Sequence, residues 1–259
     1  MNSANAITEE ITLLMIGDTG MGKSSFGNLY LHERVFKESQ STIPVTLKAV
    51  VEMRRINGMN VNVIDTEGLN DGNSASSVQI QNLATLLKNY KKGVNGIAII
   101  LNGRYHRFSQ GVKDLIKFTY NAFGTKDVLN HICVVFTNCD HPTNPDRNLK
   151  RTEYKDCVRN YLSEVSGDPI QNIPEIPVYF VDCCNQDNEE TKENMIQLHG
   201  WICSKNALDT SNFKPAGYRE DNVIEKRNHF FVKSETRGNI TYEIFEDQER
   251  TKIIPNNKE

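Results

Sequence analysis

One stretch limits the possible folds of this chain more than any other. Residues 17–24 read GDTGMGKS, and they directly follow the apolar run 11–16. A strand that leads into a glycine-rich loop and then a helix directs successive backbone N–H groups and the helix N-terminus at a phosphate chain. The sequence therefore predicts a site for the phosphates of a nucleotide. A chance glycine-rich turn is the alternative, and the strand before the loop argues against it.

The predicted loop would bind phosphate through both its backbone and its side chains. Gly20 and Gly22 would let the backbone pass close to the phosphates. Lys23 would reach the outer phosphates with its positive charge, and the Ser24 hydroxyl would bind a Mg²⁺ ion that bridges phosphate oxygens. The residues expected to contact nucleotide here are Thr19, Gly20, Gly22, Lys23, Ser24 and Ser25.

A second phosphate element follows the strand expected at residues 61–65. The sequence of residues 65–68 is DTEG. Asp65 can hold Mg²⁺ through water, and the backbone N–H of Gly68 can bond the γ-phosphate, so that the segment after it orders only when this phosphate is present. The polar, aperiodic residues 32–44 are the other segment expected to respond to nucleotide.

Strand and helix signals alternate along the chain up to residue 204. Asn57-Gly58, between the strands expected at 45–56 and 61–65, predicts a β-hairpin and hence one antiparallel strand at the edge of a mostly parallel sheet. The alternation elsewhere predicts a doubly wound α/β domain with right-handed crossovers. The further strands are expected at residues 96–101, 132–136 and 176–181, and the helices at 23–31, 74–90, 108–123, 147–165 and 190–204.

The last part of the chain differs in character from the first. Residues 229–234, 240–245 and 251–254 alternate apolar and polar types around the turn-like residues 237–239. We expect a nucleotide-binding domain at residues 1–204 and a small β-rich C-terminal extension at 205–259. A partly disordered tail is the alternative, because so few strands bury little surface.

Charge and composition disfavour several classes of function. A net charge of −3, with lysine and arginine scattered along the chain, argues against nucleic-acid binding. No apolar run is long enough to span a bilayer and no signal peptide is evident, so we expect no transmembrane segment and a cytoplasmic location. The six cysteines show no CxxC pair, and we expect no histidine at metal-ligand spacing from them. We expect reduced thiols, with a redox-sensitive Cys183-Cys184 pair as the alternative.

The motifs occur in the order of a guanine-nucleotide-binding domain: GDTGMGKS, Thr46, DTEG, and TNCD at residues 137–140. Over residues 12–203 the chain resembles the AIG-type, immunity-associated GTPase family (GIMAP), which is related in fold to septins and to the chloroplast Toc GTPases. Residues 36–46 resemble the switch segment of that family, residues 101–109 its conserved box, and residues 136–140 its base-recognition motif.

The resemblance implies which residues complete the nucleotide site. The carboxylate of Asp140 can accept two hydrogen bonds from guanine, which favours guanine as the bound base. The alternative is an adenine-specific P-loop enzyme, such as a small kinase. TNCD departs from the usual NKxD, because Asn138 stands where a lysine would pack on the base. The implied Mg²⁺ ligands are Ser24, Thr46 and Asp65, and the implied base contacts are Thr137, Asn138, Asp140, Asp182 and Cys183.

The resemblance also implies GTP hydrolysis, but the chain departs from Ras-like machinery. Leu69 occupies the place of a water-orienting glutamine, and Glu67 replaces a proline common in the family. We therefore expect slow hydrolysis by the monomer, and a homodimer across the nucleotide face in which Arg104 acts in trans. A GTP-dependent assembly scaffold without hydrolysis is the alternative, with Arg104 and Arg107 as solvated loop charges. The residues expected to act in catalysis are Lys23, Thr46, Glu67, Gly68 and Arg104.

Overall fold

The computed structural model describes residues 10–37, 49–66, 68, 77–104, 107–123, 125–139, 146–185, 187–211, 213–214, 229–237 and 240–247. The chain divides into two compact units, Met1–Gly217 and Tyr218–Glu259. The first unit contains a six-stranded sheet, and the second contains a two-stranded sheet.

The sheet of the first unit has the strand order β2-β3-β1-β4-β5-β6. Neighbouring strands from β3 to β6 run parallel, whereas β2 pairs antiparallel with β3. Asn57 and Gly58, at the β2–β3 turn, have φ of 51° and 83°, as a type I′ hairpin turn requires. The structure thus confirms the predicted mostly parallel sheet with one antiparallel edge strand. The strands are β1 (Glu10–Ile16), β2 (Val50–Ile56), β3 (Met59–Asp65), β4 (Gly96–Asn102), β5 (Ile132–Thr137) and β6 (Val178–Phe180).

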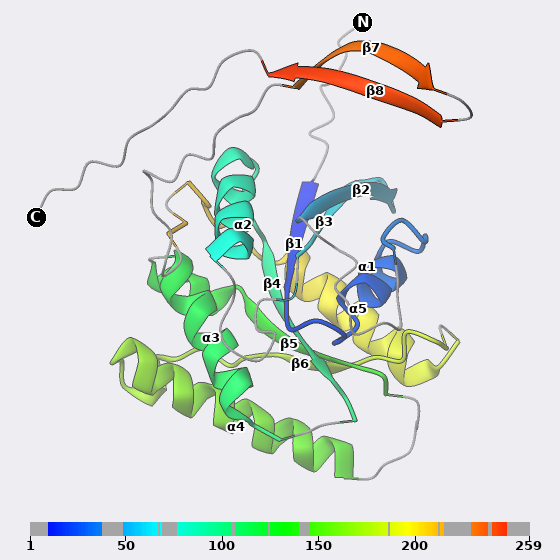
Figure 1. The fold of residues 1–259 in the computed structure, drawn as a ribbon. Helices are drawn as coiled ribbons and strands as arrows, with labels where there is room; N and C mark the ends of the chain where they lie inside the picture. Colours follow the sequence, from blue (N-terminus) through cyan, green and yellow to red (C-terminus); the bar gives the residue numbers. More distant parts are fainter. Residues whose placement is uncertain are drawn as a thin grey trace, which may run out of the picture. The chain divides into compact units, whose positions relative to one another are not determined.

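Helices cover both faces of this sheet. One face carries α1 (Lys23–Tyr30) and α5 (Glu189–Cys203) (Figure 1). The other carries α2 (Ser77–Asn89), α3 (Gln110–Phe123) and α4 (Asp146–Ser166). These helices lie at or near their predicted places. Two short 3-10 helices, η1 (Lys126–Asn130) and η2 (Ile170–Asn172), were not predicted. Within the described residues, no helix combines the length and the apolar character needed to cross a bilayer.

The central strands are covered on both faces, which explains why their sequences are apolar runs rather than alternating patterns. All six residues of β5 are buried, and in β1 and β4 only one end residue is partly exposed. On the side of α1 and α5, Met15, Phe26, Ala98 and Ile202 belong to one apolar cluster. This packing holds the carboxyl ends of β1, β4 and β5 side by side.

The residues that follow α5 pack on the first unit. Leu208 pairs with Val94 through two backbone hydrogen bonds of 2.8 and 3.0 Å. The buried Thr210 hydroxyl donates to a carbonyl near the end of α2 at 2.8 Å, and Phe213 lies buried and edge-on against Phe123. The packing of the first unit therefore continues beyond residue 204, where the sequence pattern changes.

The second unit contains an antiparallel hairpin of β7 (His229–Arg237) and β8 (Ile240–Asp247). Its register shifts between Phe231 and Lys233, so the ladder is locally irregular there. The hairpin corresponds to the strands predicted at 229–234 and 240–245. The third predicted strand, at 251–254, lies outside the described residues.

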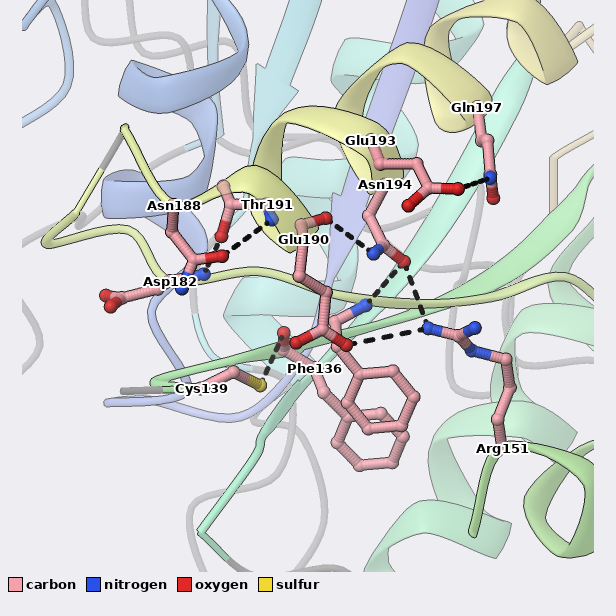
Figure 2. A network of polar contacts seen from close by, with 11 residues as sticks. Phe136, Cys139, Arg151, Asp182, Asn188, Glu190, Thr191, Glu193, Asn194 and Gln197 are labelled. Carbon is pink, nitrogen blue, oxygen red and sulfur yellow. Dashed lines mark hydrogen bonds and ion pairs between the residues drawn. The ribbon is translucent and has the colours of Figure 1, made fainter. Parts of the chain in front are cut away.

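One buried amide ties β6 to the helices beside it (Figure 2). Asn194 of α5 accepts from the Phe180 N–H at 3.1 Å and from the Arg151 guanidinium at 3.4 Å, and it donates to the Glu190 carbonyl at 2.7 Å. The Arg151 guanidinium also lies 5.1 Å from the centre of the Phe180 ring. Because Asn194 is 4% exposed, removing its amide would take the acceptor away from the Phe180 N–H in a dry environment.

We expect Asn194→Ala to lower the free energy of unfolding by about 2–3 kcal/mol, because the buried N–H of β6 loses its acceptor. The matched control is Gln197→Ala on the exposed side of the same helix, where the amide donates to Glu193 at 3.1 Å. That change should stay within about 0.5 kcal/mol. Urea denaturation followed by circular dichroism measures both, and equal losses would contradict the role assigned to Asn194.

Candidate nucleotide-binding site

The glycine-rich loop lies where the order of strands in the sheet reverses. β1 has β3 on one side and β4 on the other, and the chain leaves β1 for the loop at this point. In open α/β sheets, ligands bind outside the carboxyl ends of the strands at such a position. Gly22 caps α1 with a φ of 89°, a left-handed conformation that glycine adopts without strain. Strand, loop and helix therefore follow one another as the sequence predicts.

Lys23 turns its ammonium group back over the loop. The residue is buried, and Nζ donates to the carbonyl oxygens of Gly17 at 3.0 Å and Asp18 at 2.9 Å. These carbonyls hold a positive charge at the carboxyl end of β1. A phosphate chain in the loop would bring charge of the opposite sign to this group. Lys23 is therefore placed to bind phosphate.

Ser24 at the start of α1 meets Asp65 at the end of β3. The Ser24 hydroxyl donates to Asp65 Oδ2 at 2.7 Å. Asp65 is 1% exposed, and its Oδ1 has no hydrogen-bond partner among the described residues. A buried carboxylate oxygen without a partner is costly, and a hydrated Mg²⁺ ion would satisfy it. The two side chains therefore fit the predicted metal.

The protonation of Asp65 reflects the same environment. Burial raises the pKa of Asp65 above its usual range, while the hydrogen bond from Ser24 and the nearby charge of Lys23 partly oppose this shift. A divalent cation favours the ionised carboxylate, so Mg²⁺ and a proton compete for this group.

The DTEG element reaches the glycine-rich loop. A Cβ on Gly68 would lie 2.1 Å from Thr19 Oγ1 and 2.4 Å from Thr19 N, so that only glycine allows this approach. The Thr66 hydroxyl donates to the Met15 carbonyl at 2.7 Å and ties the element to the end of β1. The backbone at Gly68 therefore stands beside the loop, as a γ-phosphate contact requires.

Thr137 supports the loop from the end of β5. The residue is fully buried, and its hydroxyl donates to the carbonyls of Met21 at 2.6 Å and Leu101 at 3.2 Å. These bonds engage the hydroxyl with backbone, so Thr137 positions the glycine-rich loop. The next residue, Asn138, is half-buried with a φ of 54°, a conformation that asparagine tolerates.

The loops after β5 and β6 lie next to each other. The Cys139 N–H donates to the Val181 carbonyl at 3.3 Å, which joins the TNCD segment to the chain entering Asp182. Asp182 Oδ1 accepts from the Cys184 N–H at 2.9 Å, and Cys183 is partly buried against the apolar cluster. In Figure 2 the Asp182 carboxylate points away from the network around Asn194. The structure therefore brings the two predicted base-contacting segments together.

Arg104 lies beside the glycine-rich loop. A cavity of about 430 Å³ is lined by Asp18 and Met21 from the loop and by Arg104 and Arg107 from the segment after β4. Both arginines are exposed. The N–H of Gly103, the residue before Arg104, donates to the carbonyl of Thr137 at the end of β5 at 2.7 Å. The cavity thus joins the conserved-box segment to the phosphate loop.

Some predicted site residues fall outside the part of the chain that the structure describes, and two residues that line the cavity were not predicted. Thr46, Glu67 and Asp140 lie outside the described residues, so their roles stay predictions. Asp18 and Met21, which line the cavity, were missed because they occupy unrestricted positions of the GxxxxGKS motif. The remaining predicted contacts, Thr19, Gly20 and Ser25, lie on the glycine-rich loop and the first turn of α1.

Residues 11–196 match the sequence model of the AIG1 family. The chain belongs to the AIG1 family. Immune-associated nucleotide-binding protein 13 of Arabidopsis thaliana is 29% identical over 141 residues, which cover 54% of this chain and 41% of that protein. GTPase IMAP family member 8 of Mus musculus is 31% identical over 163 residues, 63% of this chain and 23% of that protein. The match to the AIG1 model confirms the predicted resemblance. The chain matches less than half the length of these two AIG1-related proteins.

Solved structures share the AIG1-family fold. Toc33 from Arabidopsis thaliana in complex with Mg²⁺ and GMPPNP aligns with a TM-score of 0.63 at 18% identity, over 80% of this chain and 87% of Toc33. An arginine-to-alanine variant of Toc33, described as dimerization deficient, aligns with a TM-score of 0.63 at 19% identity, over 75% and 83% of the two chains. A further structure, from a study of dimerization and GTPase activity in atToc33 and psToc159, gives 0.65 at 18% identity, over 78% and 86%.

We expect Asp65→Asn to lose Mg²⁺ affinity by at least about tenfold, since an interaction with a charged group is worth roughly 1.5–3 kcal/mol. The same change should leave stability in EDTA at pH 7 equal to or above that of the wild type. Because burial raises the pKa of Asp65, the folded state favours the protonated acid, and the wild type loses stability as pH rises.

The advantage of the variant should therefore shrink as pH falls toward 3.8, the ordinary aspartate pKa. Urea denaturation between pH 3.5 and 7 (about the range in which a raised carboxyl pKa acts) measures it. A wild type clearly more stable than Asp65→Asn at pH 7 in EDTA would contradict this account.

Proposed function

We propose that this chain binds GTP with Mg²⁺ and hydrolyses it to GDP and phosphate as a nucleotide-dependent switch. The hydrogen bond between Ser24 and the buried Asp65 carries the proposal, because it sets a carboxylate oxygen without a protein partner next to the glycine-rich loop. The AIG1-family relatives named for nucleotide binding and GTPase activity support it, as does the Toc33 complex with Mg²⁺ and GMPPNP.

The residues of this chain would act mainly by positioning and charge neutralisation. The loop N–H groups and Lys23 would hold the phosphates, and Ser24 and Asp65 would hold the metal. When bound, Mg²⁺ would neutralise negative charge on the phosphate oxygens. The Gly68 N–H would donate to the γ-phosphate, which links the segment after it to the nucleotide state.

Leu69, which follows Gly68, cannot orient the attacking water as glutamine does in Ras-like enzymes. Hydrolysis by one molecule alone should therefore be slow, and a second group must complete the site. Arg104 is exposed and lines the cavity beside the loop, so a second molecule docked at that face would meet it. Symmetric dimers are the commonest assemblies, and dimerization is described as important for the GTPase activity of atToc33 and psToc159.

Base choice can be tested at Asp140. Each charge-assisted hydrogen bond to guanine is worth roughly 1.5–3 kcal/mol, so Asp140→Asn should weaken GTP binding by at least about tenfold. Binding of xanthosine triphosphate should improve, because its second carbonyl can accept from the new amide. This gain is the internal control for folding. Titration calorimetry measures both ligands, and a wild type that binds ATP as tightly as GTP would exclude guanine specificity.

Turnover per molecule should rise with protein concentration in the micromolar range, and Arg104→Ala should flatten this dependence without changing GTP affinity. An arginine supplied in trans contributes about 10³–10⁵-fold in rate, so the loss should be large at high concentration. Phosphate release is the measurement, and Arg55→Ala, at an exposed arginine of β2, is the control.

A wild-type rate that does not depend on concentration would contradict the dimer mechanism, as would unchanged turnover in Arg104→Ala. If GTP then still drove self-association without hydrolysis, the assembly scaffold would be the better description.

A further inference from the structure

Two sulfur atoms and one nitrogen atom lie near one another on the face of the sheet covered by α1 and α5. The Cys203 thiol, in the last turn of α5, donates to Met59 Sδ at 3.8 Å, and its Sγ lies 3.6 Å from His199 Nε2. His199 and Cys203 stand four residues apart on α5, where helical side chains are neighbours. Met59 opens β3, at the amino end of the strand.

This group is remote from the nucleotide site. Asp65 and the glycine-rich loop lie at the carboxyl ends of β3 and β1, whereas Met59 lies at the other end of β3. A seven-residue strand spans roughly 20 Å at about 3.3 Å per residue. Cys203 is exposed, and Met59 and His199 are half-buried, so an ion can reach the group from solvent.

The three donors share a preference for soft metals. Thiolate and thioether ligands select Cu(I), and imidazole also binds copper, whereas carboxylate and water suit Mg²⁺. A structural zinc site needs four ligands, usually Cys, His, Asp or Glu. Among the described residues, no group of three or more such side chains could hold a metal. The thioether of Met59 therefore points to copper in its reduced state.

The spacing of the donors matches metal coordination. With the zinc–sulfur and zinc–nitrogen bond lengths of about 2.3 and 2.0–2.1 Å as a guide to a first-row metal, ligand atoms about 110–120° apart are separated by roughly 3.5–4.0 Å. The observed Sγ–Nε2 and Sγ–Sδ distances of 3.6 and 3.8 Å fall within this range. Cys203 Sγ therefore lies at a coordination-like distance from each of the other two donors.

A buried partner orients the imidazole. The Tyr30 hydroxyl and His199 Nδ1 share a hydrogen bond of 3.0 Å, and Tyr30 is 3% exposed. With the proton on Nδ1 donated to Tyr30, the lone pair of Nε2 faces Cys203. Metal-binding histidines commonly have such a partner, which fixes the tautomer and the orientation of the ring.

We propose that Cys203, His199 and Met59 form a binding site for one Cu(I) ion, with Tyr30 as its orienting partner. Binding forms bonds from the metal to Sγ, Nε2 and Sδ and releases the Cys203 thiol proton to solvent, with no change in oxidation state. The prediction that no histidine lies at metal-ligand spacing overlooked the four-residue separation of His199 and Cys203 on α5. The helix and β3 bring the donors together across 144 residues.

The test is anaerobic titration of the reduced full chain with Cu(I) against a chromophoric Cu(I) chelator. We expect one tightly bound ion per chain, and X-ray absorption should show two sulfur ligands and one nitrogen ligand. Tyr30→Phe should weaken binding roughly 10–100-fold, as loss of an orienting partner does, and Cys203→Ser should weaken it more. Met59→Leu, which keeps the side-chain volume, should weaken it at least about tenfold.

The matched control is Cys157→Ser, at an exposed cysteine of α4, which should bind Cu(I) as the wild type does. Thermal unfolding of each variant keeps a folding defect apart from a lost ligand. Absence of a tight 1:1 complex would overturn the proposal, as would Cu(I) affinity that is unchanged in Cys203→Ser or in Met59→Leu. GTP binding measured on the same samples tests a different site, so failure of one proposal leaves the other intact.

Discussion

The parallel pairing of β1 with both β3 and β4 is the constraint on which the rest of the structure depends. It satisfies the backbone of β1 on both edges, and the helices on either face remove water from its side chains. In a strand enclosed in this way, functional polar groups can lie only at the ends of the strand. The phosphate loop, Asp65 and Thr137 all lie at that carboxyl edge, because β1, β3, β4 and β5 run parallel and end there together.

Local signals explain what could be predicted. The Asn57-Gly58 turn, the GxxxxGKS loop and the apolar strands each depend on neighbours in the sequence, so the sheet and its antiparallel edge followed directly. Contacts between distant residues could not be predicted in the same way. The Thr137 hydroxyl acts on Met21, 116 residues away, and this contact is visible only after the fold is formed. The short helix η1, capped by the Thr125 side chain, carries too few residues for a periodic pattern.

The candidate site contains two buried charges of opposite sign, and burying either one alone would cost free energy. The Lys23 ammonium and the Asp65 carboxylate are both buried. Lys23 donates to backbone carbonyls, and its charge favours the ionised form of Asp65. Such arrangements are typical of functional sites, where shifted pKa values and unsatisfied atoms gather in one place. The side chain of Asn194 differs, because its buried amide oxygen and nitrogen both have hydrogen-bond partners within the protein.

The single unsatisfied oxygen of Asp65 has a consequence for the abundance of this protein in a cell. A ligand that binds only the folded chain adds RT ln(1 + [L]/Kd) to its stability, about 2.7 kcal/mol when the ligand is present at a hundred times its Kd. Part of the stability of the fold would then depend on the metabolic supply of nucleotide and metal. Chains that fail to bind would unfold more often and be removed faster by proteases, even where every other contact is intact.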